Sequence, residues 1–158
     1  MPIILEGPDC AGKSTMADEL ARQLNLNIIK MTCNGNQSKS DYCEKLACRH
    51  VVIDRCWISE RIYSKYFGRI PRVDEFNERY LNDLCKQRDI QIVVLLPPLE
   101  DIYDRLDNRG DEFENVVCPN IDDIYADYEK YCEEHPQIIV VHDGLASTVI
   151  KEVLKCKL

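Results

Sequence analysis

The sequence predicts an α/β fold in which a mostly parallel five-stranded sheet carries helices on both faces. Short apolar runs typical of buried strands alternate with segments whose apolar residues recur every three or four positions, as amphipathic helices require. Such alternation favours parallel strands joined by helical crossovers. A glycine-rich loop, residues 7–14, stands between the first strand and the first helix. Ligands gather at the carboxyl ends of parallel strands, so the residues there are the first candidates for function.

Local patterns define the elements of the first half. The apolar run Pro2–Leu5 predicts a buried strand, and Met16, Leu20 and Leu24 then recur at helical spacing. Further strands are expected at 27–31 and 50–54, a polar loop at 32–41, and helices at 42–48 and 57–67, the latter ended by Gly68 and Pro71.

The second half continues the alternation. Pro97-Pro98 marks the start of a helix after a strongly apolar strand, and residues 109–119 are polar and interrupted at Gly110. The remaining strands are expected at 91–96 and 138–141, and the remaining helices at 73–84, 99–106, 121–132 and 146–155.

Length and composition indicate one domain, residues 1–158, because a chain of 158 residues with 45% hydrophobic content supports a single core. No apolar run approaches the roughly 20 residues that span a bilayer, and no leader pattern begins the chain, so we expect a cytoplasmic protein without membrane contact. The nine cysteines are odd in number and contain no C-x-x-C pair, which favours reduced thiols. Three scattered histidines argue against a zinc site.

The formal charge of −8 disfavours a nucleic-acid partner, because affinity for a phosphate polymer depends on clustered Lys and Arg. A small anionic ligand held by a few local cations is compatible with this charge. The charge balance therefore favours small-molecule partners.

The loop Gly7-Pro8-Asp9-Cys10-Ala11-Gly12-Lys13-Ser14 fits the pattern Gly-x-x-x-x-Gly-Lys-Ser. Glycines let backbone N–H groups and the following helix N-terminus face phosphate oxygens. Lys13 adds a positive charge, and the Ser14 hydroxyl is a candidate ligand for Mg²⁺. The alternative is a glycine turn that binds nothing. We expect a nucleotide phosphate site formed by Gly7, Asp9, Cys10, Ala11, Gly12, Lys13, Ser14 and Thr15.

Two pairs of charged residues stand near this loop in the predicted fold. Asp54-Arg55 follows a buried strand, where the carboxylate can hold Mg²⁺ and the guanidinium can bind phosphate; a surface ion pair is the alternative. Arg105 and Arg109 lie one helical turn apart at the start of the polar segment, where they could stabilise a transferring phosphoryl group. Asp101 offers Arg105 an ordinary helix-surface pair instead.

Several other residues have two interpretations. Asp9 could receive a hydroxyl of an acceptor or cap a turn, and Lys30 could contact an acceptor phosphate or be solvated. Aromatic stripes at helical spacing are more often core than ligand contacts, so we expect one or two to line a pocket and the others to be buried. These aromatic residues are Tyr42, Trp57, Tyr63, Tyr66 and Phe67.

Taken together, these motifs resemble the thymidylate kinases. Leu5–Thr15 is similar to the opening of that family, and Asp54-Arg55-x-x-x-Ser59-x-x-x-Tyr63 to its second motif. The segment 96–100, with Arg105 and Arg109 after it, resembles the fourth strand and lid entry, and 141–144 the last strand near the adenine. The resemblance implies a P-loop kinase fold with a short lid at about 109–119 and an acceptor-binding region at about 30–49.

The resemblance further implies transfer of the ATP γ-phosphoryl group to a deoxynucleoside monophosphate, with Mg²⁺ as cofactor. It places the donor phosphates on Lys13, Mg²⁺ on Ser14 and Asp54, and a catalytic arginine at Arg109, with Arg105 beside it, since Cys10 stands where some family members carry an arginine. The acceptor contacts that it implies are Asp9 at the sugar 3′-hydroxyl and Arg55 at the phosphate, with Ser59 and Tyr63 of the second motif beside them. Lys30 and Tyr42 are further candidates for acceptor binding.

Departures from the family weaken the prediction of thymine specificity. The Arg-Glu-Pro-Gly segment is missing, with Lys30 as its candidate substitute, and Ser64 replaces a glutamine. The predicted acceptor is therefore dTMP or a related or modified pyrimidine deoxynucleotide, and a compact enzyme of this kind suits a virus. Rival interpretations are a deoxynucleoside kinase, a DNA-base kinase and a non-catalytic nucleotide-binding module. The family also suggests a homodimer, for which Trp57, Ile58 and Tyr80 form a candidate face.

Overall fold

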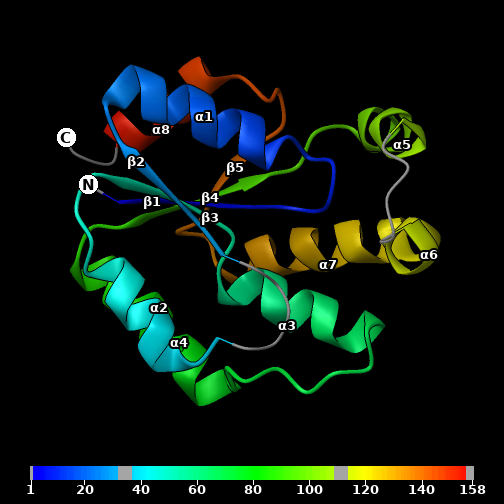
Figure 1. Cartoon of the computed structure of the whole chain (residues 1–158), viewed down its shortest axis with the longest axis horizontal. Coiled ribbons are helices and arrows are strands. Elements are labelled where there is room, and N and C mark those ends of the chain that lie inside the picture. Colours follow the sequence, from blue (N-terminus) through cyan, green and yellow to red (C-terminus); the bar gives the residue numbers. More distant parts are fainter. Residues whose placement is uncertain (1, 32–36, 109–113, 156–158) are drawn as a thin grey trace.

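The computed structural model describes residues 2–31, 37–108 and 114–155. Its centre is a five-stranded sheet with the strand order β2-β3-β1-β4-β5, and every strand pairing is parallel. The predicted α/β fold class is thus confirmed (Figure 1). The strands are β1 (Ile3–Glu6), β2 (Asn27–Lys30), β3 (Val51–Asp54), β4 (Gln91–Leu95) and β5 (Ile139–Val141).

Helices cover both faces of the sheet (Figure 1). Successive side chains of β1 point to opposite faces of the sheet: Ile3 and Leu5 pack in one apolar cluster and Ile4 in the other. Both faces are therefore apolar and are covered by helices. One face carries α1 (Lys13–Leu24) and α8 (Ala146–Lys155); the other carries α2 (Lys39–Leu46), α3 (Trp57–Tyr66), α4 (Glu75–Gln87) and α7 (Ile121–Glu134). The remaining helices are α5 (Leu99–Asp107), α6 (Glu114–Val117) and the 3₁₀ turn Cys118–Asn120.

Capping residues correct two of the expected helix starts. Helix α2 begins at Lys39 inside the predicted loop 32–41, because Ser38 N–H donates to Asp41 Oδ2 (2.7 Å) in a capping box. Helix α4 begins after Asp74, whose carboxylate accepts from Asn77 N–H (2.8 Å). The segment 114–120, expected to be irregular, is helical.

The prediction of a dimer face is wrong for two of its three residues, because they are not at the surface. The side chains of Trp57 and Ile58 are 1% and 0% exposed, since they pack in the apolar cluster beneath the sheet, and only Tyr80 is exposed. Tyr42 and Tyr63 are buried in the same cluster, as expected of most of the aromatic residues. The homodimer itself stays a prediction. No helix in the described ranges combines the length and hydrophobicity that a membrane-spanning segment needs.

Candidate active site

The glycine-rich loop joins β1 to α1 at the carboxyl edge of the sheet. Because β1 lies between β3 and β4, this loop has Asp54 on one side and Leu95 on the other. Gly7 has φ of 140°, and a Cβ atom there would lie 2.4 Å from the carbonyl oxygen of Leu95. Gly12 has φ of 92° and is the N-cap of α1. Only glycine allows both the conformation and the close approach at position 7.

The side chain of Lys13 folds back against the first residues of the loop. Its Nζ donates to the carbonyl oxygens of Gly7 (2.8 Å) and Pro8 (2.6 Å), and the side chain is buried. Burial lowers its pKa to about 8, with Arg55 acting in the same direction and nearby carboxylates opposing. Within the described ranges this buried ammonium forms no ion pair, and a bound phosphate would supply an anionic partner, as its predicted role requires.

Ser14 and Asp54 meet beside the loop, as the sequence predicted. Ser14 Oγ donates to Asp54 Oδ2 (3.1 Å) from the first turn of α1. The other carboxylate oxygen, Asp54 Oδ1, is buried and has no hydrogen-bond partner among the described residues. A buried, unsatisfied oxygen next to a hydroxyl fits the oxygen ligands that Mg²⁺ prefers. These two residues could therefore hold a magnesium ion at the phosphate loop.

A second group of predicted residues forms one cluster on the α3 side. The guanidinium of Arg55 forms an ion pair with Asp9, and its Cζ lies 5.5 Å from the ring centre of Tyr63. Asp9 N–H donates to the Tyr63 hydroxyl (2.9 Å). Burial, reinforced by Asp9, raises the pKa of Tyr63 well above its usual range, so this hydroxyl stays protonated. The cluster places a cation and a carboxylate beside the loop, and the buried Tyr63 supports them from the core.

Tyr42 and Ser59, which were predicted to contact the acceptor, are buried in the core. Tyr42 is 3% exposed and packs edge-on against Trp57, with ring centres 5.5 Å apart. Ser59 is fully buried and donates its hydroxyl to Glu6. Both support the site from the core and do not line it. Lys30 is exposed at the carboxyl end of the edge strand β2, in register with Asp54.

Sequence reasoning missed Glu6, a fully buried carboxylate immediately before the loop. Its Oε1 accepts from the backbone N–H groups of Cys56 (2.5 Å) and Ser59 (3.2 Å). Its Oε2 accepts from the hydroxyls of Ser59 and Tyr128, the latter at 3.0 Å. The only sequence signal is an acidic residue that ends an otherwise apolar strand. Glu6 joins β1 to α3 and α7.

Of the two arginines expected at the lid entry, the structure describes only Arg105. Arg105 Nη1 donates to the carbonyl oxygen of Cys10 (3.0 Å), which brings α5 to the loop. The alternative pairing also exists, because Arg105 Nη2 lies 3.7 Å from Asp101 Oδ2. Arg109 lies outside the described residues, as does the first part, 109–113, of the predicted lid 109–119. Its catalytic role stays a prediction.

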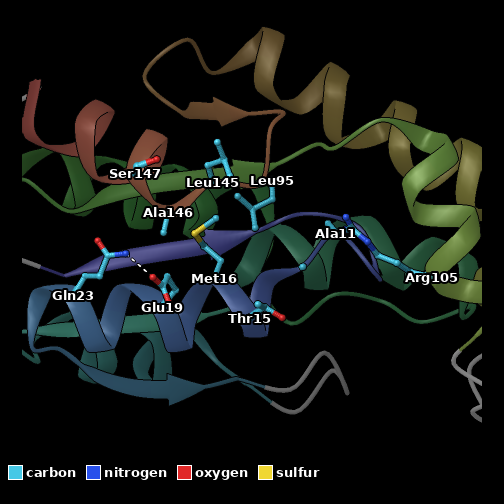
Figure 2. Close-up of a pocket in the computed structure, with 12 residues that line it drawn as sticks. Ala11, Thr15, Met16, Glu19, Gln23, Leu95, Arg105, Leu145, Ala146 and Ser147 are labelled. Atoms are coloured by element: carbon cyan, nitrogen blue, oxygen red, sulfur yellow. Dashed lines mark hydrogen bonds between the residues drawn. The ribbon is translucent and has the colours of Figure 1, made fainter.

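A cavity of about 660 Å³ extends from the loop along α1 (Figure 2). Gly12, Thr15 and Arg105 border its phosphate end. Gly144 and Leu145, which follow β5, and Ala146 and Ser147, in the first turn of α8, form the opposite wall. Of the segment 141–144 that was predicted to lie near the adenine, Gly144 lines the cavity. Two further lining residues, Glu19 and Gln23, belong to α1, and sequence reasoning named neither of them.

The sheet order, the phosphate loop and the charged groups around it define a nucleotide-kinase fold of the P-loop class. The chain belongs to the family of the SPβ prophage-derived protein YorR of Bacillus subtilis, to which it is 35% identical over 134 residues, 81% of this chain and 79% of YorR. The crystal structure of YorR in complex with phosphorylated GDP superposes with a TM-score of 0.82 and 27% identity, covering 100% of this chain and 99% of that one. No family model matches the sequence.

More distant similarities agree with this fold. An adenylate kinase isoenzyme 6 homologue of Caenorhabditis elegans is 32% identical over 127 residues, 73% of this chain and 65% of the homologue. Deoxyadenosine kinase of M. mycoides has a TM-score of 0.62 at 18% identity, covering 99% and 98% of the two chains. Thymidylate kinase of Candida albicans has a TM-score of 0.65 at 15% identity, covering 99% and 92%. The latter two show the fold alone.

Proposed function

We propose that this protein is a deoxynucleoside monophosphate kinase that transfers the γ-phosphoryl group of a nucleoside triphosphate, ATP by resemblance, to dTMP or a related pyrimidine deoxynucleotide. The observation that carries the proposal is the placement of two sites on opposite sides of one phosphate loop. The Arg55–Asp9–Tyr63 cluster lies on the α3 side, and the cavity lies between α1 and residues 144–147. Such an arrangement suits a donor and an acceptor that meet at the loop.

Each side of the loop has a defined task in this reaction. The loop N–H groups and Lys13 would bind the donor phosphates, and Arg55 the acceptor phosphate. Mg²⁺, held by Ser14 and Asp54, would neutralise charge on the transferring phosphoryl group. An oxygen of the acceptor monophosphate attacks the γ-phosphorus as the bond to the β-phosphate oxygen breaks, which leaves two nucleoside diphosphates.

A monophosphate acceptor needs no general base, because its attacking oxygen is already ionised at neutral pH. A nucleoside acceptor would need Asp54 to take a hydroxyl proton, whereas in the proposed arrangement the unpaired Oδ1 of Asp54 would be engaged with Mg²⁺. The geometry therefore favours the monophosphate. The complex of YorR with phosphorylated GDP supports a nucleotide ligand, and its prophage source supports a viral origin.

The test is a coupled assay of nucleoside diphosphate release against a panel of dNMPs, NMPs, modified pyrimidine monophosphates and the matching nucleosides. We expect turnover with one monophosphate and not with its nucleoside. Asp54→Asn should raise the Mg²⁺ concentration needed for half-maximal rate, whereas Asp83→Asn, on the exposed side of α4, should not. Turnover with nucleosides alone would replace the proposal with a deoxynucleoside kinase, and silence across the panel would overturn catalysis on free nucleotides.

Lys13→Ala should lower kcat by several orders of magnitude, because the ammonium that neutralises donor phosphate charge is removed. The same assay measures this, and the melting temperature shows whether the fold is intact. An unchanged kcat would exclude the loop as the donor site.

A further inference from the structure

The end of the cavity remote from the phosphate loop carries hydrogen-bonding side chains. Glu19 lies one helical turn beyond Thr15 on α1, about 6 Å along the helix axis. Gln23 follows one turn later, and Ser147 lies across the cavity on α8 (Figure 2). A nucleotide whose phosphates occupy the loop would extend its base toward this end. The polar groups there are therefore candidates for recognition of the base.

Glu19 has one carboxylate oxygen occupied and one available. Oε1 accepts from Arg22 Nη2 (2.6 Å) and Gln23 Nε2 (2.5 Å), while Oε2 has no hydrogen-bond partner in the part of the chain that the structure describes. These bonds, from Arg22 first and then Gln23, lower the pKa of Glu19, so the group is ionised at neutral pH and can only accept hydrogen bonds. Its side chain is 39% exposed, which leaves it accessible to a ligand.

An ionised carboxylate distinguishes the two purines. Guanine presents adjacent donors, N1–H and the 2-amino group, which the two lone pairs of the available Oε2 can accept together. Adenine presents a donor, its 6-amino group, beside the lone pair of N1, which a carboxylate repels. A neutral amide does not discriminate in this way, because its acceptor and donor, side by side, complement the 6-amino group and N1 of adenine as well as N1–H and O6 of guanine.

We propose that Glu19 reads the base in the cavity and selects guanine, so that a guanine nucleotide is the preferred ligand of the donor site. The assignment of the cavity as the donor site rests on the proposed function. If that function is correct, GTP is a better phosphoryl donor than ATP.

The test measures dissociation constants of GDP, IDP and ADP by titration calorimetry with wild type, Glu19→Gln and Glu152→Gln. Glu152 is the matched control, because it pairs with Lys155 on the exposed side of α8, outside the cavity lining. We expect wild type to bind GDP at least about tenfold more tightly than ADP, a difference of about 1.4 kcal/mol. IDP lacks the 2-amino group and should fall between them. Glu19→Gln should abolish the preference, and Glu152→Gln should keep it.

The proposal would be overturned by equal affinities for GDP and ADP, or by a preference that Glu19→Gln leaves unchanged at an unaltered melting temperature. This result is separable from failure of the proposed function. Guanine selection without turnover on any acceptor would reject the kinase and leave the base-reading role of Glu19 intact. Turnover with equal use of ATP and GTP would support the kinase and reject the base-reading role of Glu19.

Discussion

Lys13 carries its charge at a buried position. It is buried against two carbonyl oxygens, and its pKa falls from 10.5 to about 8. In the unfolded chain the lysine keeps its ordinary pKa, so between about pH 8 and pH 10.5 the unfolded state binds more protons than the folded state. Stability therefore rises with pH across that window, by an amount of order 3 kcal/mol at most.

This predicts a pH-dependent difference between wild type and Lys13→Met, which cannot titrate there. The free energy of unfolding of wild type should increase relative to the variant from pH 8 to pH 10, measured by urea denaturation without nucleotide. Below pH 8 the penalty of the buried ammonium is complete, and the difference should be constant. Parallel profiles across the whole range would show that Lys13 keeps an ordinary pKa in the folded protein.

At the scale of elements, the junction of β1 with the phosphate loop leaves no room for a side chain. Gly7 and Gly68 both have positive φ, but only at Gly7 would a Cβ atom meet backbone, at 2.4 Å from the Leu95 carbonyl oxygen; at Gly68 nothing lies within 4 Å. A side chain at either position would be strained by the positive φ, but only a side chain at position 7 would also clash with β4.

Gly7→Ala should therefore destabilise the protein by more than Gly68→Ala, whose expected loss is about 1–2 kcal/mol from backbone strain. Thermal unfolding of the two variants measures the difference, and nucleotide binding should be lost only in Gly7→Ala. Equal melting temperatures would mean that β1 and β4 separate without penalty at this point.

At the scale of the whole molecule, Glu6 connects three parts of the structure. One carboxylate joins β1 to the start of α3 through Cys56 and Ser59 and to α7 through Tyr128, which is 122 residues away in sequence. The connection links the phosphate loop to the helix that carries Tyr63 and to the helix that follows the lid segment. Loss of this carboxylate would leave several buried donors unsatisfied, at about 1–3 kcal/mol each.

Glu6→Ala should lower the free energy of unfolding by several kcal/mol, a large part of the 5–15 kcal/mol typical of a domain. Glu6→Gln should restore most of it. Its amide oxygen can accept from the backbone N–H groups of Cys56 and Ser59, and its amide N–H₂ can donate to the hydroxyls of Ser59 and Tyr128, which accept as well as donate. Only the longer bond from Gly7 N–H (3.3 Å) would be lost. Chemical denaturation of both variants measures the rescue. A glutamine variant as unstable as the alanine variant would show that the negative charge itself is required.

Much of this architecture could be predicted because it depends on neighbours in the chain. The alternation of strands and helices follows from local periodicity, and the glycines and lysine of the loop follow from its tight turn around phosphate. The meeting of Ser14 with Asp54 was predictable as well, since parallel strands end at one edge. The predicted start of a helix was wrong where a capping interaction sets it, as the capping box of Ser38 and Asp41 does for α2.

The sequence by itself determined the fold class, the phosphate loop and the identity of the groups around it. Only the tertiary structure decided which side chains face the ligand and which support it: it buried Ser59 and Trp57, joined Glu6 to Tyr128, and placed Glu19 in the wall of the cavity. The physical reason is that periodicity shows which face of an element is apolar but not which distant element covers it. A polar residue acquires its role from partners that only folding brings within hydrogen-bond distance.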